Sequence, residues 1–232
     1  MLWMLLSCML SFQEEGDLKS ISVEQTRAAH HFNYDKPIKS SVRIVAMSDK
    51  ETELGHGSGN YFKIGKHRFV LTAAHVVADD NLVMYIQDGG FLVEAGVAYV
   101  DNVRDIAIIV PKANLTVKPI SYKRNKKPNI VGETVVYAGF PADFGLSVFN
   151  GTVSICSTSS FTMQSFALPG SSGSVVFDNK GRVLGVVSAL KMGFYPHSPF
   201  PQLHPTMVYV ARTNNLSRHD IQEIIVKWNN LK

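Results

Sequence analysis

The sequence predicts an all-β protein, either a barrel or a sandwich, that ends in one α-helix. Short runs rich in β-branched and aromatic residues recur along most of the 232 residues, with Gly, Asn, Asp and Lys between them. This pattern is typical of antiparallel strands joined by tight turns. Near the end the period changes, because Ile221, Ile224 and Ile225 fall on one helical face behind a capping-box-like start at Ser217.

The expected strands form two series, which a basic heptad from Tyr122 to Pro128 separates. We expect this heptad to be a solvated loop rather than a nucleic-acid site. Asn150-Gly151 and the stretch 178–181 carry the residues of tight turns. In chain order, a short helix is expected at 23–32, strands at 42–47, 61–64, 68–72, 82–86, 91–100, 105–110, 134–138, 147–149, 152–155, 161–166, 174–177, 183–188 and 207–211, and the last helix at 217–230.

Composition and cysteine usage exclude several classes of protein. Hydrophobic residues make up 45% of the chain and charged residues 18%, as in ordinary globular domains, and the net charge of +4 is mild. Two cysteines, Cys8 and Cys156, provide no disulfide framework. The cysteines lack the spacing of metal ligands, and the adjacent His30 and His31 would point apart. The sequence therefore predicts neither a metal site nor a cofactor.

The first twelve residues are almost wholly apolar, which is too short a run to span a bilayer. The stretch from Leu5 to Cys8 loosely resembles a lipoprotein cleavage box, but no Lys or Arg precedes it, as one normally does in a signal peptide. Two interpretations stay open. The segment is either an export signal, which favours an extracytoplasmic protein, or a retained segment that docks on a membrane or partner in a virion or cell.

A Gly-Ser-Ser-Gly-Ser stretch, residues 170–174, lies between an apolar run and a strand-like Val-Val-Phe. The glycines at 170 and 173 permit a tight loop with positive φ. Such a loop can present one serine hydroxyl while it turns successive backbone N–H groups toward a common point. The stretch therefore suits a nucleophile beside an oxyanion hole, although a plain hairpin loop has the same composition.

Two other stretches favour the nucleophile. Thr72-Ala-Ala-His75 ends an apolar strand with one histidine, and Asp105-Ile-Ala precedes a second buried-looking strand. Together with the Gly-x-Ser-Gly around Ser172, these motifs resemble the three signatures of trypsin-like serine peptidases, in that family's order. Gly57-Ser-Gly59 and the run from Val131 to Pro141 resemble the compact bacterial and viral branch. The resemblance covers roughly residues 40–212.

The resemblance implies a fold and a division of the chain. The fold is two Greek-key six-stranded β-barrels with the active site between them and a C-terminal helix. Residues 1–38 would then form an N-terminal extension and 39–232 the peptidase domain, with barrel 1 at about 39–120, barrel 2 at about 129–212 and the helix at about 217–230.

The resemblance also implies a role for each candidate residue. Ser172 would attack the peptide carbonyl, and His75 would accept its proton, because imidazole changes charge near neutral pH. Asp105 would orient His75, with Asp101 as the alternative. The backbone N–H groups of Gly170 and Ser172 would bind the oxyanion.

Residues of the expected substrate pocket are assigned by the same resemblance. Phe166 matches the base of the pocket for the P1 residue, Ser188 would lie beside Asp105, and Leu190 would narrow the pocket. Because no acid occupies the base, the prediction is a small or medium apolar P1 residue. The expected function is a serine endopeptidase acting on proteins or peptides, without nucleic acid. The alternative is a peptidase-fold protein used for binding or as a structural part of an assembly such as a virion.

Overall fold

The computed structural model describes residues 34–48, 52–193 and 202–231, with backbone alone at 190–193 and 202–205. The chain divides into two compact units, Met1–His31 and Phe32–Lys232, and every described residue belongs to the second. The apolar segment, Cys8, His30, His31 and the helix expected at 23–32 therefore lie outside the described residues.

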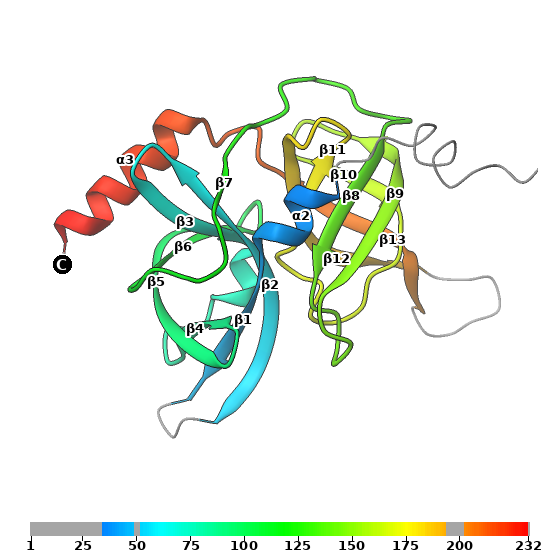
Figure 1. The fold of residues 1–232 in the computed structure, drawn as a ribbon. Helices are drawn as coiled ribbons and strands as arrows, with labels where there is room; N and C mark the ends of the chain where they lie inside the picture. Colours follow the sequence, from blue (N-terminus) through cyan, green and yellow to red (C-terminus); the bar gives the residue numbers. More distant parts are fainter. Residues whose placement is uncertain (1–33, 49–51, 194–201, 232) are drawn as a thin grey trace, which may run out of the picture. The chain divides into compact units, whose positions relative to one another are not determined.

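The first half of the second unit is a closed barrel (Figure 1). A short helix, α2 (Asp35–Ser40), precedes it. The strands pair in the order β1-β4-β5-β6-β3-β2, and β1 closes the ring by pairing with β2. A short seventh strand, β7, joins β2 in parallel. The strands are β1 (Ser41–Met47), β2 (Glu53–Ile64), β3 (His67–Thr72), β4 (Val83–Asp88), β5 (Phe91–Asp101), β6 (Ile106–Pro111) and β7 (Ile120–Ser121).

The second half is another closed barrel of six strands, in the order β10-β13-β12-β11-β8-β9. A connector from Tyr122 to Glu133 joins it to β7 and runs along the top of the view in Figure 1. The architecture is thus the expected pair of six-stranded barrels, and the chain ends in helix α3 (Arg218–Asn230). The strands are β8 (Thr134–Gly139), β9 (Ser147–Cys156), β10 (Ser160–Gln164), β11 (Val175–Asp178), β12 (Val183–Gly193) and β13 (Gln202–Arg212).

Aromatic side chains join the two barrels. Phe62 of β2 lies 6.1 Å, between ring centroids, from Phe177 of β11, and the edge of Tyr122 meets Phe62 at 5.5 Å. All three residues are fully buried. The Tyr122 hydroxyl donates a hydrogen bond to the Leu216 carbonyl, and burial raises the pKa of Tyr122 to about 12. This shared core fixes the start of the connector.

The C-terminal helix follows the sequence prediction closely. Ser217 is its N-cap, and the capping box with Asp220 is complete, since each side chain bonds the other residue's backbone N–H. Ile221 and Ile225 are buried against the barrels. Among the described residues, no helix is long and apolar enough to cross a membrane.

The turn predicted at Asn150-Gly151 is wrong. The structure has one continuous strand, β9, in which Asn150 pairs with Val136 and Gly151 with Val135. A Cβ at residue 151 would lie 2.3 Å from the Gln164 carbonyl oxygen, so glycine is needed there for close packing between strands rather than for a turn. Strand β2 also begins earlier than expected, at Glu53 instead of residue 61. Its first half was not predicted as a strand because it is rich in glycine, which is depleted in strands.

Candidate active site

His75 projects from a one-turn 3₁₀ helix (Ala74–Val76) that directly follows β3. The strand is anchored by Phe69, Val70 and Leu71, which are completely buried. The histidine side chain itself is about half exposed (48%). An apolar strand thus ends at the surface of the barrel and delivers one imidazole there.

Asp105 lies at the start of β6 and faces His75. Its Oδ2 lies 2.9 Å from His75 Nδ1, and its Oδ1 accepts a hydrogen bond from the His75 backbone N–H at 2.9 Å. The Ser188 hydroxyl donates a further hydrogen bond to Oδ2. Burial opposes ionisation of Asp105, but these hydrogen bonds outweigh it and hold the pKa of the carboxyl below its usual range.

The backbone at Asp105 is in the left-handed region, with φ of 58°. Asp tolerates this conformation better than most residues, at a cost of about 1–3 kcal/mol. Asp101, the alternative, caps the preceding turn by accepting the backbone N–H groups of Val103 and Arg104. The structure therefore brings Asp105, not Asp101, to His75.

The loop that carries Ser172 is folded by its two glycines, Gly170 and Gly173, both with φ of 90°. A Cβ at residue 173 would lie 2.0 Å from the Ser58 carbonyl oxygen, so no larger residue fits there without a shift of backbone. The Ser58 N–H donates to the Ser172 carbonyl at 2.7 Å. Strand β2 of the first barrel thus holds the Ser172 loop of the second.

Two further bonds orient the peptide groups around Gly170. The Pro169 carbonyl accepts the Ala142 N–H at 2.7 Å, and the Gly170 carbonyl accepts the Ser58 hydroxyl at 2.7 Å. Both carbonyls are therefore engaged with groups outside the loop. Among the backbone hydrogen bonds between described residues, neither the Gly170 N–H nor the Ser172 N–H has an acceptor. These two N–H groups remain available to an oxyanion.

His75, Gly170 and Ser172 line one cavity of about 310 Å³. Ser172 is half-buried. The rest of the lining comes mainly from the first barrel and is largely apolar, with His56 as a second imidazole. The candidate nucleophile, the candidate base and two backbone N–H groups without a backbone acceptor thus lie at one hollow.

Comparison with known proteins gives the family. Residues 57–186 match the trypsin-like peptidase domain, a span that includes all three residues of the candidate triad. The chain belongs to the trypsin-like peptidase family.

Individual relatives agree with this assignment. A Synechocystis sp. protein described as serine protease HhoB is 30% identical over 148 residues, or 58% of this chain and 35% of that protein. A Pseudomonas fulva protein described as a DegP-like periplasmic serine endoprotease is 34% identical over 167 residues, or 68% of this chain and 34% of that protein. The chain thus spans about a third of the length of these relatives.

A solved structure shares the fold. The serine endoprotease from Yersinia pestis superposes with a TM-score of 0.63 at 20% sequence identity, covering 82% of this chain and 64% of that one.

Several residues around the candidate site were not predicted as functional from sequence. The Ser58 hydroxyl also accepts the Phe140 N–H at 2.9 Å, so it bridges the Gly170 carbonyl and the loop after β8. His56 Nε2 lies 3.2 Å from the Phe140 carbonyl oxygen. Ala142 has an unusual φ of 44°. The one signal in the sequence was the closely spaced glycines at 57 and 59, which mark a strand that another backbone approaches.

The expected pocket residues are placed unequally. Ser188 is half-buried and contacts Asp105, as the family resemblance implies. Phe166 is 44% exposed, packs at 6.1 Å against Phe149, and lies outside the lining of the 310 Å³ cavity. Leu190 is within β12, but its side chain lies outside the described residues.

Among the described residues, no three potential metal ligands of the His, Cys, Asp or Glu type gather in one place.

Proposed function

We propose that this chain is a serine endopeptidase that uses Ser172, His75 and Asp105. The observation that carries the proposal is the convergence of three hydrogen bonds on Asp105, two from His75 and one from Ser188, beside a hollow that Ser172 also lines. A carboxylate held this firmly keeps a proton on His75 Nδ1, the ring nitrogen that faces Asp105. Nε2 is then the basic nitrogen that faces the hollow.

In the proposed reaction, Ser172 Oγ forms a bond to the peptide carbonyl carbon and its proton passes to His75 Nε2. The carbonyl oxygen becomes an oxyanion, which the N–H groups of Gly170 and Ser172 bind. The C–N bond then breaks, and His75 returns the proton to the leaving amine. Water, deprotonated by the same nitrogen, hydrolyses the acyl-enzyme and restores Ser172.

The orientation of the Pro169–Gly170 peptide supports the oxyanion role. If this peptide were flipped, its carbonyl oxygen would replace the Gly170 N–H in the hollow and would repel an oxyanion. The bond from Ala142 N–H to the Pro169 carbonyl holds the other orientation. An oxyanion donor that is already aimed needs no reorganisation during the reaction.

We further propose that the preferred P1 residue is apolar and of small or medium size. By the family resemblance Phe166 is assigned to the pocket base, and in the structure Tyr137 donates its hydroxyl to the Phe166 carbonyl. A buried substrate lysine or arginine would find no carboxylate there. Leu190 is proposed to limit the size of the residue that fits.

The proposed substrates are proteins or peptides in an extracytoplasmic compartment. The DegP-like relative from Pseudomonas fulva is described as periplasmic, and this description supports the proposed location.

A fluorophosphonate probe tests the proposal, because it reacts covalently with an activated serine. We expect the probe to label the full chain at Ser172, as located by peptide mass spectrometry, and to label Ser172→Ala not at all. Ser154→Ala is the matched control, since Ser154 is an exposed serine on β9, and it should be labelled like the wild type. A folded wild-type protein that resists the probe would indicate a binding or structural role instead.

A further inference from the structure

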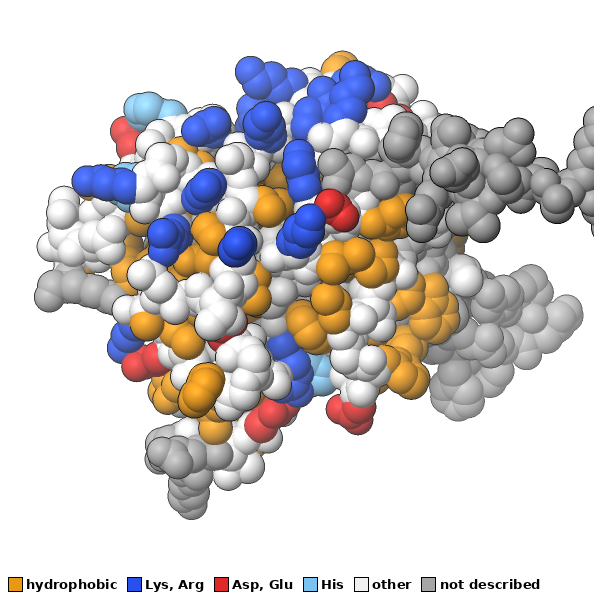
Figure 2. Space-filling model, viewed as in Figure 1, with side chains coloured by type: hydrophobic (Ala, Val, Ile, Leu, Met, Phe, Trp, Pro, Cys, Tyr) orange, Lys and Arg blue, Asp and Glu red, His pale blue; other side chains and the backbone are white. Residues whose placement is uncertain are grey.

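The connector between the barrels forms one wall of a second hollow. Residues 124–128 line it on one side, and the turn after β9, the end of β13 and Asn214 line it on the other. Its volume is about 560 Å³. Lys and Arg side chains gather over the upper part of the face in Figure 2, the part over which the connector runs in Figure 1.

The most informative residue of this hollow is Arg212, which is only 5% exposed. Its guanidinium donates to the carbonyls of Pro128 and Ser157 at 2.9 Å each and to the Lys127 carbonyl at 2.7 Å. It also lies 3.2 Å from the Cys156 sulfur. All these acceptors are neutral, and no carboxylate of the described residues lies within 4 Å of the guanidinium.

A buried positive charge is normally matched by a negative one, because its desolvation is costly. Three more cations line the same hollow: Lys127, which is paired with Glu133, and Arg124 and Lys126. Arg124 donates to the Asn214 carbonyl, and Lys126 is exposed. Neither forms an ion pair with a described carboxylate. Three cations of this hollow thus have no described carboxylate within 4 Å, and Asp220 attracts Arg124 only over a longer distance.

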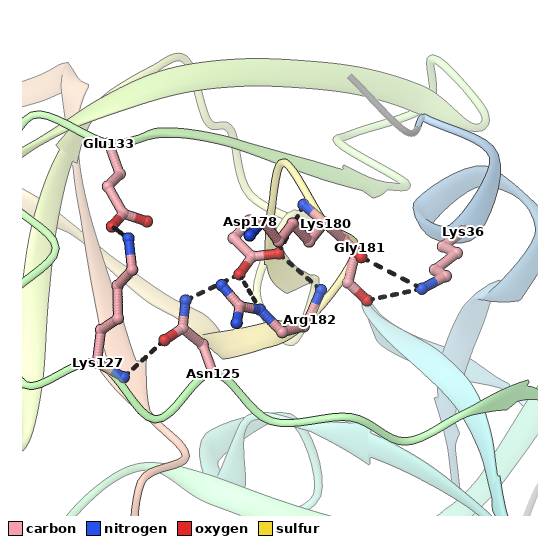
Figure 3. Close-up of polar contacts among 8 residues, drawn as sticks. All are labelled: Lys36, Asn125, Lys127, Glu133, Asp178, Lys180, Gly181 and Arg182. Carbon is pink, nitrogen blue, oxygen red and sulfur yellow. Dashed lines mark hydrogen bonds and ion pairs between the residues drawn. The ribbon is translucent and has the colours of Figure 1, made fainter. Parts of the chain in front are cut away.

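The neighbouring carboxylates are already engaged. Figure 3 shows Glu133 bound to Lys127, and Asp178 bound to both Arg182 and Asn125. None of the residues that line the hollow is an Asp or a Glu. No acidic side chain of the lining therefore neutralises Arg212, Arg124 and Lys126.

We propose that this hollow, lined by Arg124, Lys126 and Arg212, is a binding site for a soluble anion with two or three linked phosphate groups. Phosphate oxygens accept the forked donors of arginine and the point charge of lysine. A chain of linked phosphates is narrow and carries several negative charges. One such anion can therefore contact all three cations around the hollow. The site is separate from the proposed peptidase chemistry, and its test needs no activity.

Cys156 provides the readout, because its sulfur lines the hollow and is partly exposed. We would measure the rate of its alkylation by iodoacetamide in the full chain, by peptide mass spectrometry, with Cys8 in the same sample as the internal reference. Tripolyphosphate should slow the reaction at Cys156 by about ten-fold at ten times its dissociation constant, as expected when the bound form is protected. Potassium chloride of equal ionic strength should not.

Two variants test the contacts. Arg124→Ala combined with Lys126→Ala should raise the tripolyphosphate concentration needed for half-protection by at least about ten-fold. The control variant, Lys66→Ala combined with Lys227→Ala, removes two exposed charges elsewhere and should leave the half-protection concentration unchanged. Because Arg124 also holds Asn214, the single exposed change Lys126→Glu serves as a variant whose folding is not at stake.

Three results would overturn the proposal. In the first, tripolyphosphate fails to protect Cys156 of the wild type. In the second, it protects Cys156 of Arg124→Ala/Lys126→Ala and of Lys126→Glu as well as it protects Cys156 of the wild type. In the third, citrate, a tricarboxylate of similar charge, would protect as strongly, which would show that the hollow does not select phosphate.

Discussion

The two barrels contribute to the candidate active site in different ways. The first barrel supplies side chains: His75 from the turn after β3 and Asp105 from the start of β6, joined by hydrogen bonds of 2.9 Å. The second supplies the hydroxyls of Ser172 and Ser188 and, above all, a backbone conformation: the loop of Gly170 to Gly173 has two residues with φ of 90° and two N–H groups without a backbone acceptor. The His75–Asp105 pair thus depends on which residue types occupy two positions. The conformation of the Ser172 loop depends on contacts with strands that are distant in the sequence.

The largest expected effect comes from the two groups that exchange the proton. Ser172→Ala and His75→Ala should each lower kcat/KM for a peptide substrate by up to about 10⁶-fold, since such residues act as a unit. Combining the two changes should add little further loss. Circular dichroism should show an unchanged fold. A loss of less than ten-fold in either folded variant would contradict its assignment.

Asp105→Asn should be next, with a loss of roughly 10⁴-fold, because an amide favours the wrong tautomer of His75. Asp101→Asn is the matched control on the same loop, and it should change kcat little, since Asp101 caps a turn. Steady-state kinetics of both variants distinguish the two aspartates. If the larger loss came from Asp101, the hydrogen bonds around Asp105 would be structural only.

The substrate pocket should discriminate by charge more than by size. Placing a P1 lysine or arginine against Phe166 would bury an unpaired charge at a cost of several kcal/mol. An added methylene on an apolar P1 residue is worth only about 1–3 kcal/mol. A peptide library varied at P1 should therefore show basic residues cleaved far more slowly than Val or Leu. Equal rates would place the pocket away from Phe166.

Ser58→Ala addresses the backbone side of the comparison. It removes the hydroxyl that joins the Gly170 carbonyl to the Phe140 N–H, and leaves every proposed catalytic side chain in place. Loss of a whole oxyanion donor costs about 10²–10³ in kcat, so a loosened donor should cost less, about ten-fold. KM should change little. Restoration by Ser58→Thr, which keeps the hydroxyl, would identify the bond as the cause.

The smallest effect concerns acid stability. The pKa of Asp105 is lowered in the folded protein, so its ionised form stabilises the fold at pH values above the ordinary Asp range. This stabilisation is lost as the pH falls through the lowered pKa. The difference in unfolding free energy between wild type and Asp105→Asn should therefore shrink as the pH falls below the ordinary Asp range, as measured by urea titration at several pH values.

The contact between His75 and Asp105 could be predicted from sequence, because each residue lies in a local context that suggests a role. His75 ends an apolar strand, and Asp105 precedes another. The supports of the loop could not be predicted in this way. Ser58 lies 112 residues from Gly170, and its role depends on how two barrels meet. Nothing local marks Ala142 as the donor to the Pro169 carbonyl.

The fold shows the same division. Helix α3 was predicted to within one residue at its start, because its cap and apolar face are both local patterns. Helix α2 was not predicted, since it has only six residues and is held by contacts such as those of Lys36 with the carbonyls of Lys180 and Gly181. The error at Asn150-Gly151 arose because a turn-forming pair is also compatible with a strand that another backbone crosses closely.

The bonds from Ser58 to the Ser172 loop have a consequence for the order in which the protein is made. The ribosome releases the first barrel before the second, and domains generally fold from the N-terminal side during synthesis. Asn60, two residues after Ser58 on β2, also accepts a hydrogen bond from the Val175 N–H at 2.9 Å. The earlier half of the chain is therefore the template on which the later loop takes its shape. On a nascent chain the proposed active site can therefore form only after the second barrel has followed the first out of the ribosome, so the proposed peptidase activity would begin no earlier than that point.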